Sequence, residues 1–300
     1  MKPVVIGTRA STLALAQAGQ VAAALGAMHP GLVVEIRHIT TRGDRITDRP
    51  LAALGRNGVF VTEIETALRE KVIDLAVHSA KDLPSRLAPD MTLAALLERE
   101  DPRDVLISDG PVLADLPPGA RIGTSSPRRA AQLRTLRPDL ALLDIRGNVD
   151  TRLRRLASGE YHALVLAAAG LIRLGRAAEI TEWLDPTVML PAVGQGALAV
   201  ETRAGDAAMR QLAAPLAHAA TSAAVSAERA FLAELGADCT AVAGALASVA
   251  PGGVLVLDAL VGASDGRLVR GRLSGDAGDP GLGGRLARRL RAEAEEAHAP

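Results

Sequence analysis

The stretch Arg121-Ile122-Gly123-Thr124-Ser125-Ser126-Pro127-Arg128-Arg129 has the pattern of a short strand, a turn and the start of a helix. Ser126 suits the N-cap and Pro127 the first helical position, because serine caps free N–H groups and proline tolerates that position. The N-terminal end of such a helix attracts anions, and Arg128 and Arg129 add two guanidiniums there. The stretch therefore predicts an α/β fold with an anion-binding site where this strand meets its helix.

The same pattern occurs again in Leu142-Leu143-Asp144-Ile145-Arg146-Gly147-Asn148-Val149-Asp150-Thr151-Arg152. This second strand, turn and helix start brings Arg146 and Arg152 to the same kind of place. Two such segments predict a floor lined with arginine. That floor suits a ligand with several carboxylates or phosphates, which guanidinium groups bind in a bidentate manner.

Short apolar runs alternate with helical patterns through roughly the first 200 residues. This alternation predicts helices that cover a largely parallel sheet. The expected helices include Ser11–Leu25 and Phe60–Lys71. The expected strands are Val4–Gly7, Leu32–Ile39, Leu75–His78, Arg121–Gly123, Leu140–Ile145 and Ala163–Ala167.

The composition changes near Pro215, and a smaller α+β domain is expected from there on. Its expected helices are Thr221–Leu235 and 282–297. Its expected strands are Gly244–Val249, Val254–Val261 and Arg267–Leu273, the last two joined by a hairpin turn at Ser264-Asp265-Gly266.

Composition excludes several classes of protein. The chain has 300 residues, 48% of them apolar, and no net charge, which predicts two or three domains and no general nucleic-acid binding. The longest apolar run, Ala163–Ile172, is too short to cross a membrane, so a soluble cytoplasmic protein is expected. Cys239 is the only cysteine and the histidines lack ligand spacing, so we expect no disulfide and no metal site.

Val77-His78-Ser79-Ala80-Lys81-Asp82-Leu83-Pro84 places polar residues after an apolar strand. Ser79, Lys81 and Asp82 should lie at the carboxyl end of that strand, where open α/β sheets bind ligands. Asp82, among cations, should remain an anion that stabilises developing positive charge. A Lys–Asp surface pair at a turn is the alternative interpretation. His78 is interpreted as a packed strand-end residue.

Four other features allow more than one interpretation. The irregular segment 40–58 predicts a lid or binding loop, or a tolerated surface insertion. Gly194-Gln195-Gly196-Ala197-Leu198-Ala199 matches a dinucleotide-binding string, but its context favours a close-packed crossover between domains. The charged run 98–104 is either a solvated face or a salt-bridged hinge. Cys239 is either a small buried residue or an attachment thiol.

These segments together resemble the porphobilinogen deaminase (hydroxymethylbilane synthase) family. The resemblance is carried in order by 6–11, 41–44, 76–84, 98–104, 123–129, 146–152, 169–171, 190–197 and Cys239. It implies two α/β domains like those of periplasmic binding proteins, with an active-site cleft between them, and a smaller C-terminal α+β domain. The implied domains are 1–97 with 197–217, 98–196, and 218–300.

The resemblance also implies the activity. Family members are transferases that join four porphobilinogen molecules into hydroxymethylbilane, with release of ammonia, in tetrapyrrole and haem biosynthesis. The chain grows on a dipyrromethane cofactor held by a thioether, here to Cys239. Porphobilinogen is the small-molecule partner, and a cytoplasmic monomer that binds neither nucleic acid nor membrane is expected.

Site residues follow from the resemblance position by position. Asp82 is the catalytic candidate. The cofactor candidates are Cys239, Ser79, Lys81, Asp82, Thr124, Ser126, Arg128, Arg129 and Arg146. The candidates for substrate and growing chain are Arg9, Ser11, Arg146, Arg152 and Arg173.

Three positions depart from the family pattern. Ala53 and Asn57 stand where lid lysines are frequent, with Arg56 nearby. Asp238 precedes Cys239, and an acidic neighbour disfavours a thiolate, so slow cofactor assembly is a hypothesis. A non-catalytic polycarboxylate-binding protein of the same fold is the alternative function, because a passive binder needs neither Asp82 nor Cys239.

Overall fold

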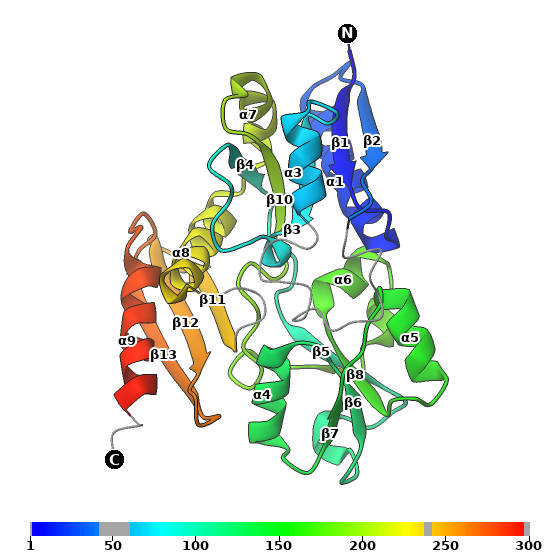
Figure 1. Cartoon of the computed structure of the whole chain (residues 1–300), viewed down its shortest axis with the longest axis vertical. Coiled ribbons are helices and arrows are strands. Elements are labelled where there is room, and N and C mark those ends of the chain that lie inside the picture. The colour runs from blue at the N-terminus through cyan, green and yellow to red at the C-terminus, as the bar shows by residue number, and fades with distance from the viewer. Residues whose placement is uncertain (1, 42–60, 237–241, 297–300) are drawn as a thin grey trace. The chain divides into compact units, whose positions relative to one another are not determined.

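The structure is a computed structural model that describes residues 2–41, 61–236 and 242–296. The chain divides into two compact units (Figure 1). Unit 1 contains Met1–Arg99 and Ala197–Ser222, and unit 2 contains Glu100–Gly196 and Ala223–Pro300.

The described part of unit 1 has one five-stranded sheet in the order β2-β1-β3-β10-β4. Its parallel strands are β1 (Val4–Thr8), β2 (Val34–His38) and β3 (Leu75–Ser79). The strand β10 (Leu198–Arg203) runs antiparallel to both β3 and β4 (Met91–Leu96).

Helices cover both faces of this sheet because side chains alternate along a strand. Ile6 and Leu75 pack in the cluster that contains the buried face of α1 (Thr12–Met28). Val5 packs with the buried face of α3 (Thr62–Arg69). The helix α7 (Ala207–Ala213) follows β10 in unit 1.

The first part of unit 2 repeats this plan with a five-stranded sheet in the order β7-β6-β8-β5-β9. Its parallel strands are β6 (Arg121–Gly123), β7 (Ala141–Leu143) and β8 (Ala163–Ala167). The strand β5 (Asp104–Ser108) is antiparallel to β8 and to β9 (Glu182–Trp183).

Three helices follow the parallel strands of this sheet. They are α4 (Pro127–Leu136) after β6, α5 (Val149–Ala157) after β7 and α6 (Ala168–Arg173) after β8. Leu133 of α4 packs against one face of the sheet, whereas Leu153 of α5 packs against the other face. The arrangement is that of a doubly wound sheet, in which ligands bind at the carboxyl ends of the strands.

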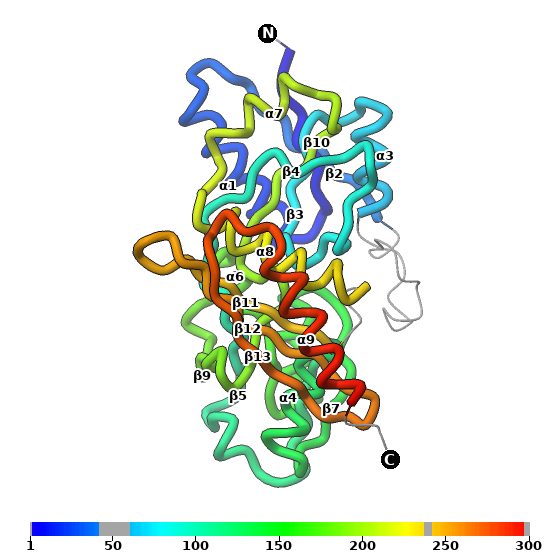
Figure 2. The backbone as a smooth tube through the Cα atoms, turned by 90° about the vertical axis from the view of Figure 1, so that its left-hand side faces the viewer, coloured from blue at the N-terminus to red at the C-terminus, as the bar shows by residue number. Residues whose placement is uncertain are grey.

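The C-terminal part of unit 2 is an antiparallel sheet with two helices. Its strands are β11 (Ala243–Val249), β12 (Val254–Gly262) and β13 (Leu268–Asp276). The helix α9 (Leu282–Glu296) runs along β12 and β13 (Figure 2). The boundary between the units falls within α8 (Ala219–Leu235), whose residues after Ser222 pack with α9 and this sheet.

Short 3-10 helices complete the described chain at Ala80–Asp82, Leu113–Asp115, Ala177–Glu179 and Ala214–Leu216. The mixed α/β class and the smaller C-terminal α+β region confirm the predicted fold class. The expected largely parallel sheet is present in each α/β part, with one strand in each, β10 or β5, antiparallel to its neighbours. The sequence reading also missed β4, β5 and β9, which carry small or charged residues beside their apolar ones.

The packing of α9 on α8 depends on a glycine. An added Cβ at Gly283 would lie 2.1 Å from the carbonyl oxygen of Ala227 and 2.7 Å from the backbone nitrogen of Phe231. At Gly284 the nearest heavy atom to an added Cβ is a carboxylate oxygen of Glu234, at 3.5 Å.

We therefore expect Gly283→Ala to destabilise the protein by about 1–3 kcal/mol, because the two helix backbones must separate. The matched variant Gly284→Ala should leave the stability close to that of the wild type. Urea unfolding followed by circular dichroism measures both. Equal midpoints for the two variants would contradict the close approach of α8 and α9.

Candidate functional site

The two arginine-bearing segments of unit 2 lie side by side at one edge of the sheet. Because β6 and β7 are parallel neighbours, their carboxyl ends meet at this edge. The backbone N–H of Thr124 donates to the carbonyl of Leu143 at 2.9 Å. The Ser125 hydroxyl donates to the Ile145 carbonyl and accepts from the Ile145 N–H. These bonds join the turn after β6 to the turn after β7.

The helix start that follows β6 forms as the sequence predicts. Ser126 is the N-cap of α4 and its hydroxyl accepts from the Arg129 N–H at 3.4 Å, while Pro127 opens the helix. Thr124 is buried just before this cap. The N-terminal end of α4 therefore places N–H donors, two hydroxyl groups and two guanidiniums close together.

Both guanidiniums of this helix start bind one buried carboxylate. Asp104 has no exposed surface, and its Oδ2 accepts from Arg128 Nη1 at 2.7 Å. Its Oδ1 accepts from Arg129 Nε at 3.1 Å and from Arg129 Nη2 at 2.7 Å. Gln195 Nε2 donates to the same Oδ1 at 2.8 Å. We name these four residues the Asp104 cluster.

Charge and burial act against each other in this cluster. Burial alone would raise the pKa of Asp104, but the adjacent Arg128 and Arg129 lower that pKa far below its usual range. Burial lowers the pKa of Arg128, and the Asp104 carboxylate only partly offsets the effect. The cluster contains two cations for one anion, so its positive charge is not balanced from within.

Three further predicted arginines follow β7 and β8 in the chain. Arg146 and Arg152 flank the N-cap of α5, and Arg152 Nε donates to the Gly147 carbonyl at 2.9 Å. Gly147 has a φ of 112°, which L side chains rarely adopt. Arg173 ends α6 and donates to the Gly196 carbonyl at 2.6 Å, and burial lowers its pKa. Unit 2 thus gathers every arginine that was predicted for it.

Unit 1 carries the other predicted residues at the carboxyl ends of β1 and β3. Ser79 and Asp82 line a small cavity of about 30 Å³ together with Arg9. Asp82 is exposed and makes no hydrogen bond or ion pair with the described part of the chain. Lys81 precedes it in the same 3-10 turn, and Ser11 is the N-cap of α1. The structure thus places these five predicted residues at or after the carboxyl ends of β1 and β3 in unit 1.

The histidine of this region is packed, as predicted. His78 is buried, and its Nε2 lies 3.0 Å from Oε2 of Glu201, which has no exposed surface. His78 also lines the cavity at the strand ends. Its contact with Glu201 holds β3 against β10, the strand that pairs with it.

Several predicted features lie outside the described residues. They are the cofactor candidate Cys239 with its neighbour Asp238, and the lid segment with Ala53, Arg56 and Asn57.

Asp104, Gln195 and Gln17 are among the buried polar residues that were not predicted from the sequence. Asp104 was interpreted as part of a charged run. Its position at the start of the apolar strand Asp104–Ser108 was the feature that could have indicated burial. Gln195 lies between Gly194 and Gly196, and those glycines determined how the segment was interpreted. Gln17 lies on the buried face of α1, and its Nε2 donates to the Ser79 hydroxyl at 2.9 Å. A polar residue on an apolar face was the available signal.

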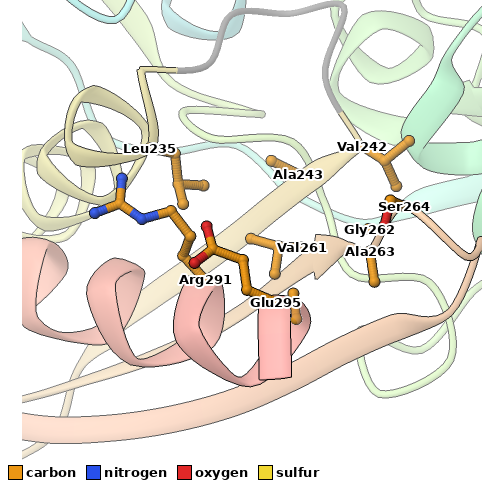
Figure 3. A pocket seen from close by; sticks show the side chains of 10 residues that line it. Leu235, Val242, Ala243, Val261, Gly262, Ala263, Ser264, Arg291 and Glu295 are labelled. Carbon is orange, nitrogen blue, oxygen red and sulfur yellow. The ribbon is translucent and has the colours of Figure 1, made fainter. Parts of the chain in front are cut away.

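Two larger hollows lie in unit 2. One, of about 410 Å³, opens between α9 and the C-terminal sheet, and apart from Ser264, Arg291 and Glu295 its lining is apolar (Figure 3). The other, of about 1070 Å³, lies at the opposite end of the strands from α4, where Arg121 begins β6. Arg121 donates there to the carbonyls of Gly159 and Glu160. Neither hollow contains a predicted site residue.

In residues 2–41, 61–236 and 242–296 no three histidine, cysteine, aspartate or glutamate side chains are grouped to hold a metal ion. Within the same residues, every helix is too short or too polar to span a membrane.

Comparisons with known proteins agree over most of the chain. Residues 4–211 match the family model "Porphobilinogen deaminase, dipyromethane cofactor binding domain", and residues 222–292 match "Porphobilinogen deaminase, C-terminal domain". The porphobilinogen deaminase of Roseiflexus castenholzii is 60% identical and covers 95% of this chain and 94% of its own. That of Stenotrophomonas maltophilia is 51% identical and covers 97% and 96%. A solved periplasmic binding protein of Salmonella typhimurium is 12% identical, with a TM-score of 0.40, and covers 72% and 92%.

The Asp104 cluster predicts a distinct acid dependence of stability. The pKa of Asp104 is lowered on folding, so its stabilising effect is complete above the unfolded pKa of about 3.9 and is lost as the pH falls below that value. Near neutral pH, Asp104→Asn should cost about 3–5 kcal/mol, because it leaves buried guanidiniums without their anion. Urea unfolding between pH 3 and pH 8 should show this cost shrinking below about pH 4.

The exposed pair Arg137–Asp139 provides the matched control. Asp139→Asn should change stability much less, because solvent screens an exposed ion pair. A cost of Asp104→Asn that stays the same at pH 3 and pH 7 would contradict the electrostatic origin assigned to it.

Proposed function

This chain belongs to the porphobilinogen deaminase family, and from that premise we propose how its own residues perform the family's reaction. The enzyme joins porphobilinogen molecules into hydroxymethylbilane with release of ammonia, and it uses a dipyrromethane cofactor. Each pyrrole of substrate and product carries an acetate and a propionate. The protein must therefore hold many carboxylates while it stabilises a cation.

The proposal rests on one observation above the others, the surplus positive charge at the start of α4. Two guanidiniums share the single carboxylate of Asp104, beside the N–H groups and hydroxyls of the helix start. This donor set fits an acidic ligand, because charge-assisted bonds to carboxylates are about twice as strong as neutral ones. We assign Thr124, Ser126, Arg128 and Arg129 to the carboxylates of the cofactor, with Arg146 beside them.

Ser79 and Lys81 are assigned to the cofactor from unit 1. Gln17 supports this role of Ser79, because its amide fixes the hydroxyl at 2.9 Å. When bound through a thioether to Cys239, the dipyrromethane supplies the pyrrole carbon to which the first substrate is joined. Cys239 is the sole cysteine of the chain, so no other thiol can take this role.

Asp82 is assigned the catalytic role. Its carboxylate is exposed and makes no hydrogen bond within the described residues, so both oxygens can accept bonds from a ligand. We propose that it accepts the pyrrole N–H bond and stabilises the cationic azafulvene that the substrate becomes when ammonia leaves. A fixed anion beside developing positive charge lowers the barrier of such a step.

The remaining arginines are assigned to the incoming substrate and the growing chain. They are Arg9, Arg146, Arg152 and Arg173, together with Ser11. Arg152 and Arg173 each donate a hydrogen bond to a glycine carbonyl, and these bonds orient the two side chains.

We also propose the domain limits 1–97 with 197–217, 98–196, and 218–300, and a monomeric enzyme of the cytoplasm. The absence of a long apolar segment from the sequence is in keeping with the proposed location. A non-catalytic polycarboxylate binder is the competing proposal. It would need the arginines but neither a catalytic Asp82 nor a cofactor thiol.

The intact mass of the purified protein tests the cofactor assignment. We expect wild-type protein to weigh two pyrrole units more than its polypeptide, and Cys239→Ser to have the polypeptide mass. The variant should fold normally, which circular dichroism checks. Wild-type protein that keeps the bare polypeptide mass after incubation with porphobilinogen would refute the attachment at Cys239.

Substitution of Asp82 tests the catalytic assignment. Asp82→Asn should retain the pyrrole mass and lose at least about 100-fold in kcat, because the amide cannot stabilise the cationic transition state. Asp90→Asn is the control, since Asp90 is also exposed but pairs with Arg69. Formation of product by Asp82→Asn at the rate of this control would remove the role of Asp82.

A further inference from the structure

The buried carboxylate of Asp104 has an unusual set of partners. It accepts four hydrogen bonds, three of them from guanidinium groups and one from the Gln195 amide. Gln195 is itself fixed by a second bond to the Pro102 carbonyl at 2.8 Å. The reaction assigned above does not use Asp104, yet burying a charge is costly unless the structure compensates it.

The two arginines that share Asp104 are used differently. Every nitrogen of the Arg129 guanidinium donates a bond, since Nη1 reaches the Val165 carbonyl at 2.9 Å and the other two reach Asp104. Arg128 donates only through Nη1, to Asp104 and to the Leu190 carbonyl at 2.5 Å. Its Nε and Nη2 have no hydrogen-bond partner among the described residues. Arg128 therefore keeps one edge of its guanidinium for a further acceptor.

The charges of the cluster lead to the same conclusion. Asp104 is the one anionic partner of Arg128 and Arg129 in the described part of the chain. A second carboxylate, supplied by a ligand at the open edge of Arg128, would bring the cluster to neutrality. Until that ligand arrives, Asp104 alone offsets the charge of two buried guanidiniums.

We propose that Asp104 is a positioning residue, a built-in counter-anion that holds Arg128 and Arg129 in place before the cofactor is loaded. Arg129 orients the Asp104 carboxylate through its two bonds to it. Arg128 presents the edge of its guanidinium that makes no hydrogen bond within the described residues to a carboxylate of the cofactor. This inference rests on the proposed function, in which the arginines bind the acidic groups of the dipyrromethane.

The test compares thermal unfolding of apo and holo protein in Asp104→Asn. Apo-protein is obtained from cells that make no porphobilinogen, holo-protein by adding porphobilinogen to it, and intact mass verifies each form. In Asp104→Asn the cofactor carboxylate should replace part of the lost negative charge. We expect the apo midpoint to fall more than the holo midpoint, so that the gap between them widens by about 5 °C or more relative to wild type.

Asp139→Asn, in the exposed pair with Arg137, should leave the gap between the forms unchanged. If apo Asp104→Asn does not fold while the holo form does, the proposal is equally supported. An equal fall in both forms, no fall in either, or failure of both to fold would overturn it. The mass of wild-type protein separately reports on the cofactor assignment, so failure of the proposed function is distinguishable from failure of this inference.

Discussion

A carboxylate with no access to solvent, that of Asp104, organises the site of unit 2. Because a buried anion must be paired, the chain brings it the two arginines of α4 and the amide of Gln195. The residues involved come from three separate segments, which are the start of β5, the start of α4 and the turn before β10. The same contacts hold the guanidiniums in fixed orientations, as a binding site for carboxylates requires.

The contacts of the Asp104 cluster continue into the C-terminal part of unit 2. The Leu190 carbonyl accepts from Arg128 at 2.5 Å and from Gln132 at 3.1 Å. The side-chain amide oxygen Oε1 of Gln132 accepts in turn from Arg270 of β13 at 2.7 Å. Glu228 of α8 is fully buried and accepts from the N–H groups of Gly194 and Ala247, each at 2.7 Å. The region that carries the proposed cofactor cysteine in its sequence is thus fixed to the arginine-bearing part by buried polar bonds.

The parallel strands explain why the ligand-binding residues lie together. Residues that follow β6, β7 and β8 are far apart in sequence, but all leave the sheet at its carboxyl edge. Ser125 connects two of these turns directly, through both of its bonds with Ile145. Unit 1 uses the same geometry with fewer charges, since Ser79 ends β3 and Asp82 lies in the turn that follows. One rule of sheet topology therefore accounts for the placement of the site residues in each unit.

The sequence by itself determined the local features. It predicted the strands β1, β3, β6 and β8 within one residue, the Ser126–Pro127 helix start, and the residue types that bind carboxylates, because capping and side-chain periodicity depend on near neighbours in the chain. Only the tertiary structure decided that β5 and β10 run antiparallel and that Asp104 of a charged run is buried. Strand direction and burial depend on partners distant in the sequence, such as Arg128 and Gln195 for Asp104, and no local pattern specifies such pairing.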